Sequence, residues 1–107
     1  MSMNSRDMQR MQKEMQRALA QAQKMQEELA STQFTGTAGG GAVTITMNGK
    51  FEITAVKIDP EAFNAEDIAD LEVMVLAAAK DAFNKASEAQ ERLTNSITGG
   101  MRIPGLF

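Results

Sequence analysis

The sequence predicts an α+β fold in which a long N-terminal helix, a two- or three-stranded antiparallel sheet and a long C-terminal helix follow one another. Two long segments, about 5–31 and 64–98, repeat apolar or small residues at helical spacing. Between them, residues 43–58 alternate apolar and polar side chains around an Asn-Gly pair. The chain has 107 residues, so we expect residues 1–107 to form a single domain.

The N-terminal segment, 5–31, is rich in Gln, Met, Glu, Ala and Lys, which favour a helix, and Ser5 is the expected N-cap. Its apolar or small residues recur in steps of three and four, which makes an unbroken heptad seam. This apolar seam consists of Met8, Met11, Met15, Ala18, Ala22, Met25 and Leu29. The helix would be about 40 Å long, whereas a compact chain of about 100 residues has a radius of gyration of about 13 Å. It should therefore project beyond a single globule or run along a partner.

The middle of the chain predicts the sheet. Residues 34–42 form a Gly-rich connection that can include a short edge strand, and 43–47 and 50–58 read as a hairpin. Asn48-Gly49 predicts a two-residue turn in which both residues have positive φ.

The second strand of this hairpin changes its alternation, because Val56 and Ile58 have the opposite parity to the preceding apolar residues. A bulge near Ala55 would explain the change, and Asp59-Pro60 should end the strand.

The C-terminal helix should begin at Asn64 as the N-cap, with Glu66 and Asp67 in its first turn. Its Ala-rich middle predicts close approach of another element. Gly99-Gly100 should stop the helix, and 99–107 form a short apolar tail. The apolar face of this helix consists of Ile68, Leu71, Val75, Ala78, Ala82, Ala86, Ala89 and Leu93.

The composition excludes several classes of function. The chain contains no Cys and no His, which excludes disulfides, thiolate or histidine catalysis and imidazole ligands. No run of about 18 apolar residues is present. The spacing of Met8, Met11 and Met15 resembles a copper(I) site, but at heptad positions Met is more typical of packing. We therefore expect a cytoplasmic protein that is not an enzyme, with no metal, no cofactor, no small-molecule substrate and no membrane partner.

The charge is distributed unevenly. Residues 1–25 hold five cations and two acids, a local charge of +3, although the net charge of the chain is -3. The cations occupy the outer heptad positions, opposite the apolar seam. They are Arg6, Arg10, Lys13, Arg17 and Lys24. Such a stripe is either a solvated face or a contact for a polyanion, and four cations within about 20 Å match successive DNA phosphates. Nearby acids offset the charge of three further cations, which are therefore weaker candidates for a polyanion contact: Lys80, Lys85 and Arg92.

Several segments together resemble the YbaB/EbfC family of bacterial nucleoid-associated proteins. They are the Gly-rich strand entry Gly-Gly-Gly-Ala-Val-Thr-Ile-Thr-Met-Asn-Gly at 39–49, Val-Lys-Ile-Asp-Pro at 56–60, residues 70–86, and Gly-Gly-Met-Arg-Ile-Pro-Gly-Leu at 99–106. The resemblance implies an intertwined homodimer with projecting helical arms, which binds DNA in the nucleoid.

The sequence therefore favours a homodimeric, non-enzymatic DNA-binding protein that contacts phosphates through Arg6, Arg10, Lys13 and Arg17, with Lys24 beside them. The alternative is a prefoldin-like chaperone or a protein–protein interaction module with apolar Met-rich arms. In that alternative, Met1, Met3 and Met8 would form a tip that holds unfolded clients.

Overall fold

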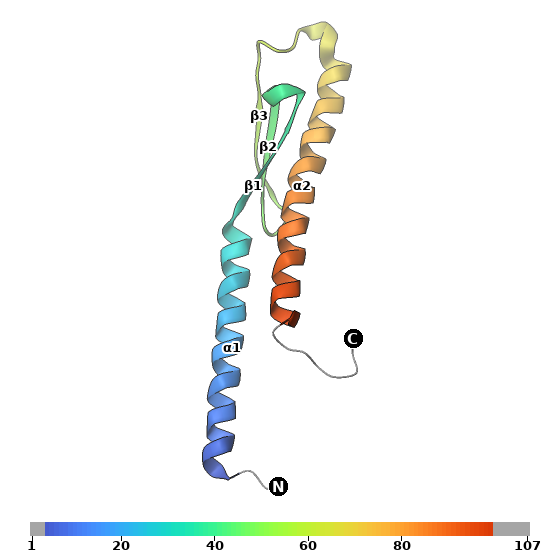
Figure 1. Cartoon of the computed structure of the whole chain (residues 1–107). Coiled ribbons are helices and arrows are strands. Elements are labelled where there is room, and N and C mark those ends of the chain that lie inside the picture. Colours follow the sequence, from blue (N-terminus) through green and yellow to red (C-terminus); the bar gives the residue numbers. More distant parts are fainter. Residues whose placement is uncertain (1–3, 100–107) are drawn as a thin grey trace.

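A computed structural model describes residues 4–99 and confirms the order of helix, antiparallel sheet and helix (Figure 1). The elements are α1 (Ser5–Ser31), β1 (Gln33–Ala38), the 3₁₀ turn η1 (Gly39–Gly41), β2 (Val43–Asn48), β3 (Ile53–Ile58), the 3₁₀ turn η2 (Ala65–Asp67) and α2 (Ile68–Gly99). The strands form one sheet in the order β1-β2-β3. The molecule measures 77 × 26 × 16 Å because α1 projects from the sheet, as its length predicts. Across residues 4–99, neither helix combines the length and the apolar character needed to cross a bilayer.

The core lies between α2 and the first two strands. Alternate side chains of β2 point toward α2 and are 0–5% exposed, and they meet a row of small residues on the helix. The core residues are Val43, Ile45, Met47, Ala78, Ala82 and Ala86.

The small residues of α2 let β1 cross the helix closely at Gly36. A Cβ atom at this position would overlap the carbonyl oxygen of Ala78 and the backbone nitrogen of Ala82. This contact confirms that the Ala-rich middle of α2 receives another element. It also shows that part of the Gly-rich segment is a strand, β1, which the sequence left as a possibility.

The predicted Asn-Gly turn is wrong. The residue of the β2–β3 loop with positive φ is Phe51, at 64°, and neither Asn48 nor Gly49 has positive φ. The Phe51 N–H donates to the Asn48 carbonyl (3.1 Å) and the Asn48 N–H donates to the Glu52 carbonyl (2.9 Å), which closes a three-residue loop. The Asn48 side-chain oxygen also accepts from the N–H groups of Lys50 and Glu52, at 2.9 and 3.1 Å.

Two tertiary contacts explain why this longer loop is favoured. A Cβ atom at Gly49 would overlap the carbonyl oxygen of Leu29, so glycine serves here to let the loop approach α1. The ring of Phe51 lies 5.2 Å from that of Phe83 on α2, centroid to centroid. A non-glycine residue in the left-handed region costs roughly 1–2 kcal/mol, and the aromatic contact offsets part of that cost.

The predicted bulge is confirmed. Thr46 pairs with Ala55 and Met47 with Ile53, so Thr54 is the extra residue on β3. The strand ends at Ile58, directly before Asp59-Pro60.

The caps of the two helices differ slightly from expectation. The N-cap of α1 is Asn4 rather than Ser5, because the Asn4 side chain accepts from the Asp7 N–H at 2.9 Å. Asn64 caps the second helical segment as predicted and forms a capping box with Asp67. This segment begins with η2, and α2 ends at Gly99, while residues 100–107 lie outside the described residues.

The outer edge of β1 is closed by side chains from α2. The Thr37 N–H donates to the Asp81 carboxylate at 3.1 Å, and the Lys85 ammonium donates to the Thr35 carbonyl at 2.7 Å. Asp81 and Lys85 also form an ion pair at 3.3 Å. The Thr37 hydrogen bond and, after it, Lys85 lower the pKa of Asp81 below its usual range. The carboxylate is therefore charged at neutral pH and keeps its hydrogen bond with Thr37 and its ion pair with Lys85.

The opposite edge of the sheet is open. Three apolar residues of β3 pair with core residues of β2 and therefore face the same side of the sheet: Ile53, Val56 and Ile58. Because α2 lies over β1 and β2, these three side chains stay 40–54% exposed. Phe83 and, seven residues earlier, Leu76 lie on the flank of α2 nearest to them and are also exposed. We call this set the β3 face, and it consists of Phe51, Ile53, Val56, Ile58, Leu76 and Phe83.

Candidate nucleic-acid interface

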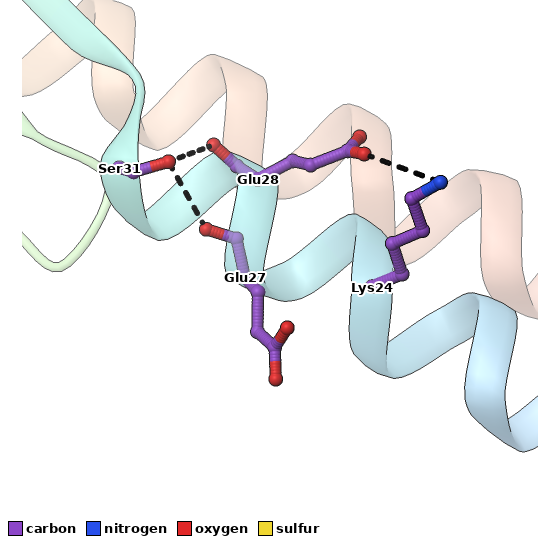
Figure 2. Close-up of polar contacts among 4 residues, drawn as sticks. All are labelled: Lys24, Glu27, Glu28 and Ser31. Atoms are coloured by element: carbon purple, nitrogen blue, oxygen red, sulfur yellow. Dashed lines mark hydrogen bonds and ion pairs between the residues drawn. The ribbon is translucent and has the colours of Figure 1, made fainter.

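Side-chain hydrogen bonds complete the C-terminal end of α1. The Ser31 hydroxyl donates to the carbonyls of Glu27 and Glu28 at 3.3 and 3.1 Å (Figure 2), and the Thr32 hydroxyl donates to the Glu28 carbonyl at 2.6 Å. These bonds satisfy carbonyls that the end of a helix leaves free. Thr32 then takes an extended conformation and β1 begins at the next residue, so there is only a short hinge between helix and sheet. The sheet thereby sets the direction of the projecting helix.

Four cations lie along one side of α1, and we call them the basic stripe. They are Arg6, Arg10, Lys13 and Arg17. All four side chains are exposed, and with Gln9 and Glu14 they line one shallow depression. The ion pairs found among residues 4–99 involve other cations, so within the described chain these four charges are free for an external anion. The stripe covers about 17 Å at the helical rise of 1.5 Å per residue.

Lys24, the fifth predicted cation, differs from the other four. Its ammonium lies 4.0 Å from the Glu28 carboxylate, one helical turn away (Figure 2). Both side chains are largely exposed, so the pair is worth little in water. Even so, the neighbouring acid reduces the positive potential that Lys24 offers to a phosphate. We therefore place Lys24 at the margin of the candidate interface.

The apolar seam occupies a different face of α1 and is only partly covered. Met25 and Leu29, near the sheet, are half-buried, whereas Met8, Met11 and Met15 are 50–63% exposed. The reason is that α2 ends at Gly99, beside the middle of α1 (Figure 1). Within the described residues, α2 therefore covers only the C-terminal half of the seam.

The structure adds residues that the sequence analysis did not single out. Leu19 lies beside the apolar seam and is 65% exposed; it lines a groove between α1 and the last turns of α2. Its signal in the sequence was a large apolar side chain next to a small seam residue, Ala18. Phe51 and Phe83 could not be paired from the sequence because their contact depends on the loop conformation. Met1 and Met3, named for the alternative chaperone tip, lie outside the described residues.

The cations of α2 do not extend the basic stripe. Lys85 is held by Thr35 and Asp81 at the edge of β1. Lys80 and Arg92 are exposed on α2 but do not line the depression that contains the basic stripe. The candidate interface is therefore the basic stripe, with Lys24 at its margin.

Comparison with known proteins identifies the family. A sequence profile described as the YbaB/EbfC DNA-binding family matches residues 3–101. The chain belongs to the YbaB/EbfC family. Among the curated members, a nucleoid-associated protein from Chloroflexus aurantiacus is 44% identical over 105 residues, which cover 98% of this chain and 100% of that protein. Another nucleoid-associated protein, from Bartonella henselae, is 46% identical over 102 residues, covering 95% of this chain and 94% of that protein.

The fold of this YbaB/EbfC member also matches a solved structure. A crystal structure of a protein from Helicobacter pylori superposes with a TM-score of 0.64 at 22% sequence identity, covering 91% of this chain and 99% of that one. This similarity supports the helix, sheet and helix architecture. The family match agrees with the resemblance seen in the sequence motifs at 39–49 and 56–60.

Proposed function

We propose that this protein is a non-enzymatic, homodimeric DNA-binding protein of the bacterial nucleoid, which contacts DNA phosphates through the basic stripe. The observation that carries the proposal is the presence of four exposed cations on one face of a projecting helix, free of ion pairs within residues 4–99. Cations placed in this way can neutralise successive phosphates and release their counterions. The family profile and the names of the relatives support DNA as the partner.

The chemistry of the stripe favours binding without strong sequence preference. Arg and Lys contacts to phosphates position a protein on DNA but do not read its sequence. The neutral hydrogen-bonding side chains beside them are few: Gln9 lines the same depression, and Gln12 and Gln16 follow on the helix. We therefore expect mixed-sequence duplexes to bind with similar affinity. A footprint confined to one motif, with negligible binding elsewhere, would contradict this reading.

We propose that the β3 face joins two copies of the chain. β3 is an edge strand whose six side chains are all exposed, and three of them are large and apolar. An exposed apolar edge strand of this kind normally pairs with another strand or is covered. Pairing two copies there would bring together two basic stripes and double the number of phosphate contacts.

Val56→Asp should weaken the proposed dimer. The substitution places a charge at the centre of the β3 face, and burying that charge on association is unfavourable. We expect the dissociation constant of the dimer to rise at least about a hundredfold, measured by sedimentation equilibrium. Ala55→Asp is the matched control, because it adds one acid to the same strand at the neighbouring position, on the opposite face of the sheet. Equal dimer affinity in the Val56 variant and the natural chain would remove this face as the dimer contact.

The proposed function is tested by fluorescence anisotropy of a mixed-sequence DNA duplex across a salt series. If six to ten phosphates are neutralised per dimer, affinity should fall by about 10³ to 10⁵ between 50 and 200 mM salt. Binding to an apolar client, as a chaperone would show, should change little or strengthen with salt. No DNA binding at 50 mM salt would overturn the proposal and favour the chaperone alternative.

A further inference from the structure

The projecting half of α1 carries an apolar track that the described chain leaves open. A groove of about 390 Å³ lies between α1 and the end of α2, and its lining is mostly apolar. It is lined by Met15, Ala18, Leu19, Gln21, Ala22, Met25, Ser96 and Ile97. A second depression, lined by Met8, Met11, Gln12 and Met15, continues the track toward the N-terminal end of α1. Met8, Met11, Met15 and Leu19 are all at least 50% exposed, so the track as a whole needs a cover.

We infer that residues 100–107 of the same chain dock along this track. The segment follows directly after Gly99, which ends α2, and Ile97 already lines the groove. The two helices run in opposite directions (Figure 1), so the last turns of α2 lead toward the N-terminal end of α1. A segment that continued in this direction would run along the track from Ile97 toward Met8.

The composition and the length of the segment fit the track. Residues 100–107 read Gly-Met-Arg-Ile-Pro-Gly-Leu-Phe, with four large apolar side chains, one cation and no acid. Eight extended residues reach about 26 Å, whereas Met8 lies only about 10 Å along the helix from Met15. Because the segment is tethered at the mouth of the groove, its effective concentration there is in the millimolar range, so weak apolar contacts suffice.

Docking of this segment is independent of DNA binding. The depressions lined by the seam and by the basic stripe have no residue in common, so the docked segment leaves the four cations open. The docked segment would also cover the exposed seam, so that no client protein is needed to shield it from water. The inference can therefore fail while the proposed function holds, and the reverse is also possible.

A disulfide test exploits the absence of Cys from the chain. Met8→Cys combined with Ile103→Cys should form an intramolecular disulfide under mild oxidation, because Ile103, four extended residues or about 13 Å beyond Gly99, would reach the Met8 end of the track when the segment is docked. Gln9→Cys with Ile103→Cys is the matched control, since Gln9 neighbours Met8 but lines the depression of the basic stripe and not the track. We expect the first pair to form at least about ten times as much intramolecular disulfide as the second. Equal yields, or disulfides that join two chains, would overturn the inference.

Methionine oxidation tests the same inference in the natural sequence. If the segment is docked about 90% of the time, hydrogen peroxide should oxidise Met11 and Met15 about tenfold more slowly in the full chain than in a chain ending at Gly99. Met47, only 5% exposed in the core, reports in each sample whether the fold is intact. Equal oxidation rates of Met11 and Met15, with Met47 protected in both chains, would show that the segment does not cover the track.

Discussion

Reversing the charge of the basic stripe should abolish DNA binding. In the variant Arg6→Glu/Arg10→Glu/Lys13→Glu/Arg17→Glu, the four free cations of each chain become acids, and the stripe then repels phosphates. Because two chains would contribute eight such contacts, we expect at least about a thousandfold loss of affinity at 50 mM salt. The measurement is fluorescence anisotropy of a mixed-sequence duplex, with sedimentation equilibrium to verify that the dimer is retained.

A smaller pair of variants separates local contacts from net charge. Arg10→Glu/Lys13→Glu and Lys50→Glu/Arg92→Glu change the total charge equally, and all four residues are exposed. The first pair lies in the stripe, whereas Lys50 lies in the β2–β3 loop and Arg92 on α2. We expect the second pair to weaken binding less than about tenfold, since screening removes distant charge effects at physiological salt. Similar losses in both pairs would mean that the stripe is not the contact surface.

Gly36→Ala should strongly destabilise the fold. The added methyl group would overlap the backbone of α2 at Ala78 and Ala82, and backbone cannot move aside as a flexible side chain can. Overpacking of this kind costs about 3 kcal/mol or more. In a domain of this size that loss lowers the melting temperature by roughly 10–20 °C, measured by circular dichroism at fixed protein concentration.

The control for this prediction is Gly40→Ala. Gly40 has positive φ, 68°, but open space around it, since a Cβ atom there would meet nothing within 4 Å. Its substitution should cost only the backbone strain, about 1 kcal/mol. If Gly36→Ala lowered the melting temperature no more than Gly40→Ala, the close crossing of β1 over α2 would not be a main determinant of stability.

The helices could be predicted from the sequence because their signals are local. The bounds 5–31 of α1 follow from an unbroken heptad pattern and the absence of Gly and Pro, and the structure has the same bounds. The N-cap was misplaced by one residue because Asn4 and Ser5 are both good caps, and only the side-chain geometry of Asn4 decides between them.

The parts that depend on tertiary contacts could not be predicted. β1 contains Gly36, which weakens the local strand signal, yet this glycine is what allows the strand to cross α2. The Asn48-Gly49 pair signals a tight turn locally, but the contacts of the loop with Leu29 and Phe83 favour a longer one. For the candidate site, the heptad phase placed the cations on one face. It did not show where α2 ends, and that point decides how much of the apolar seam stays open.

The closed edge of β1 limits how many copies of the chain can assemble. A strand from another molecule could add beside Thr35 and Thr37 only by displacing Asp81 from the Thr37 N–H and Lys85 from the Thr35 carbonyl. In the described part of the chain, this leaves β3 as the edge that can accept a strand. Two copies joined through β3 would use both open edges and present only closed ones, so the assembly terminates at two and does not grow into a filament.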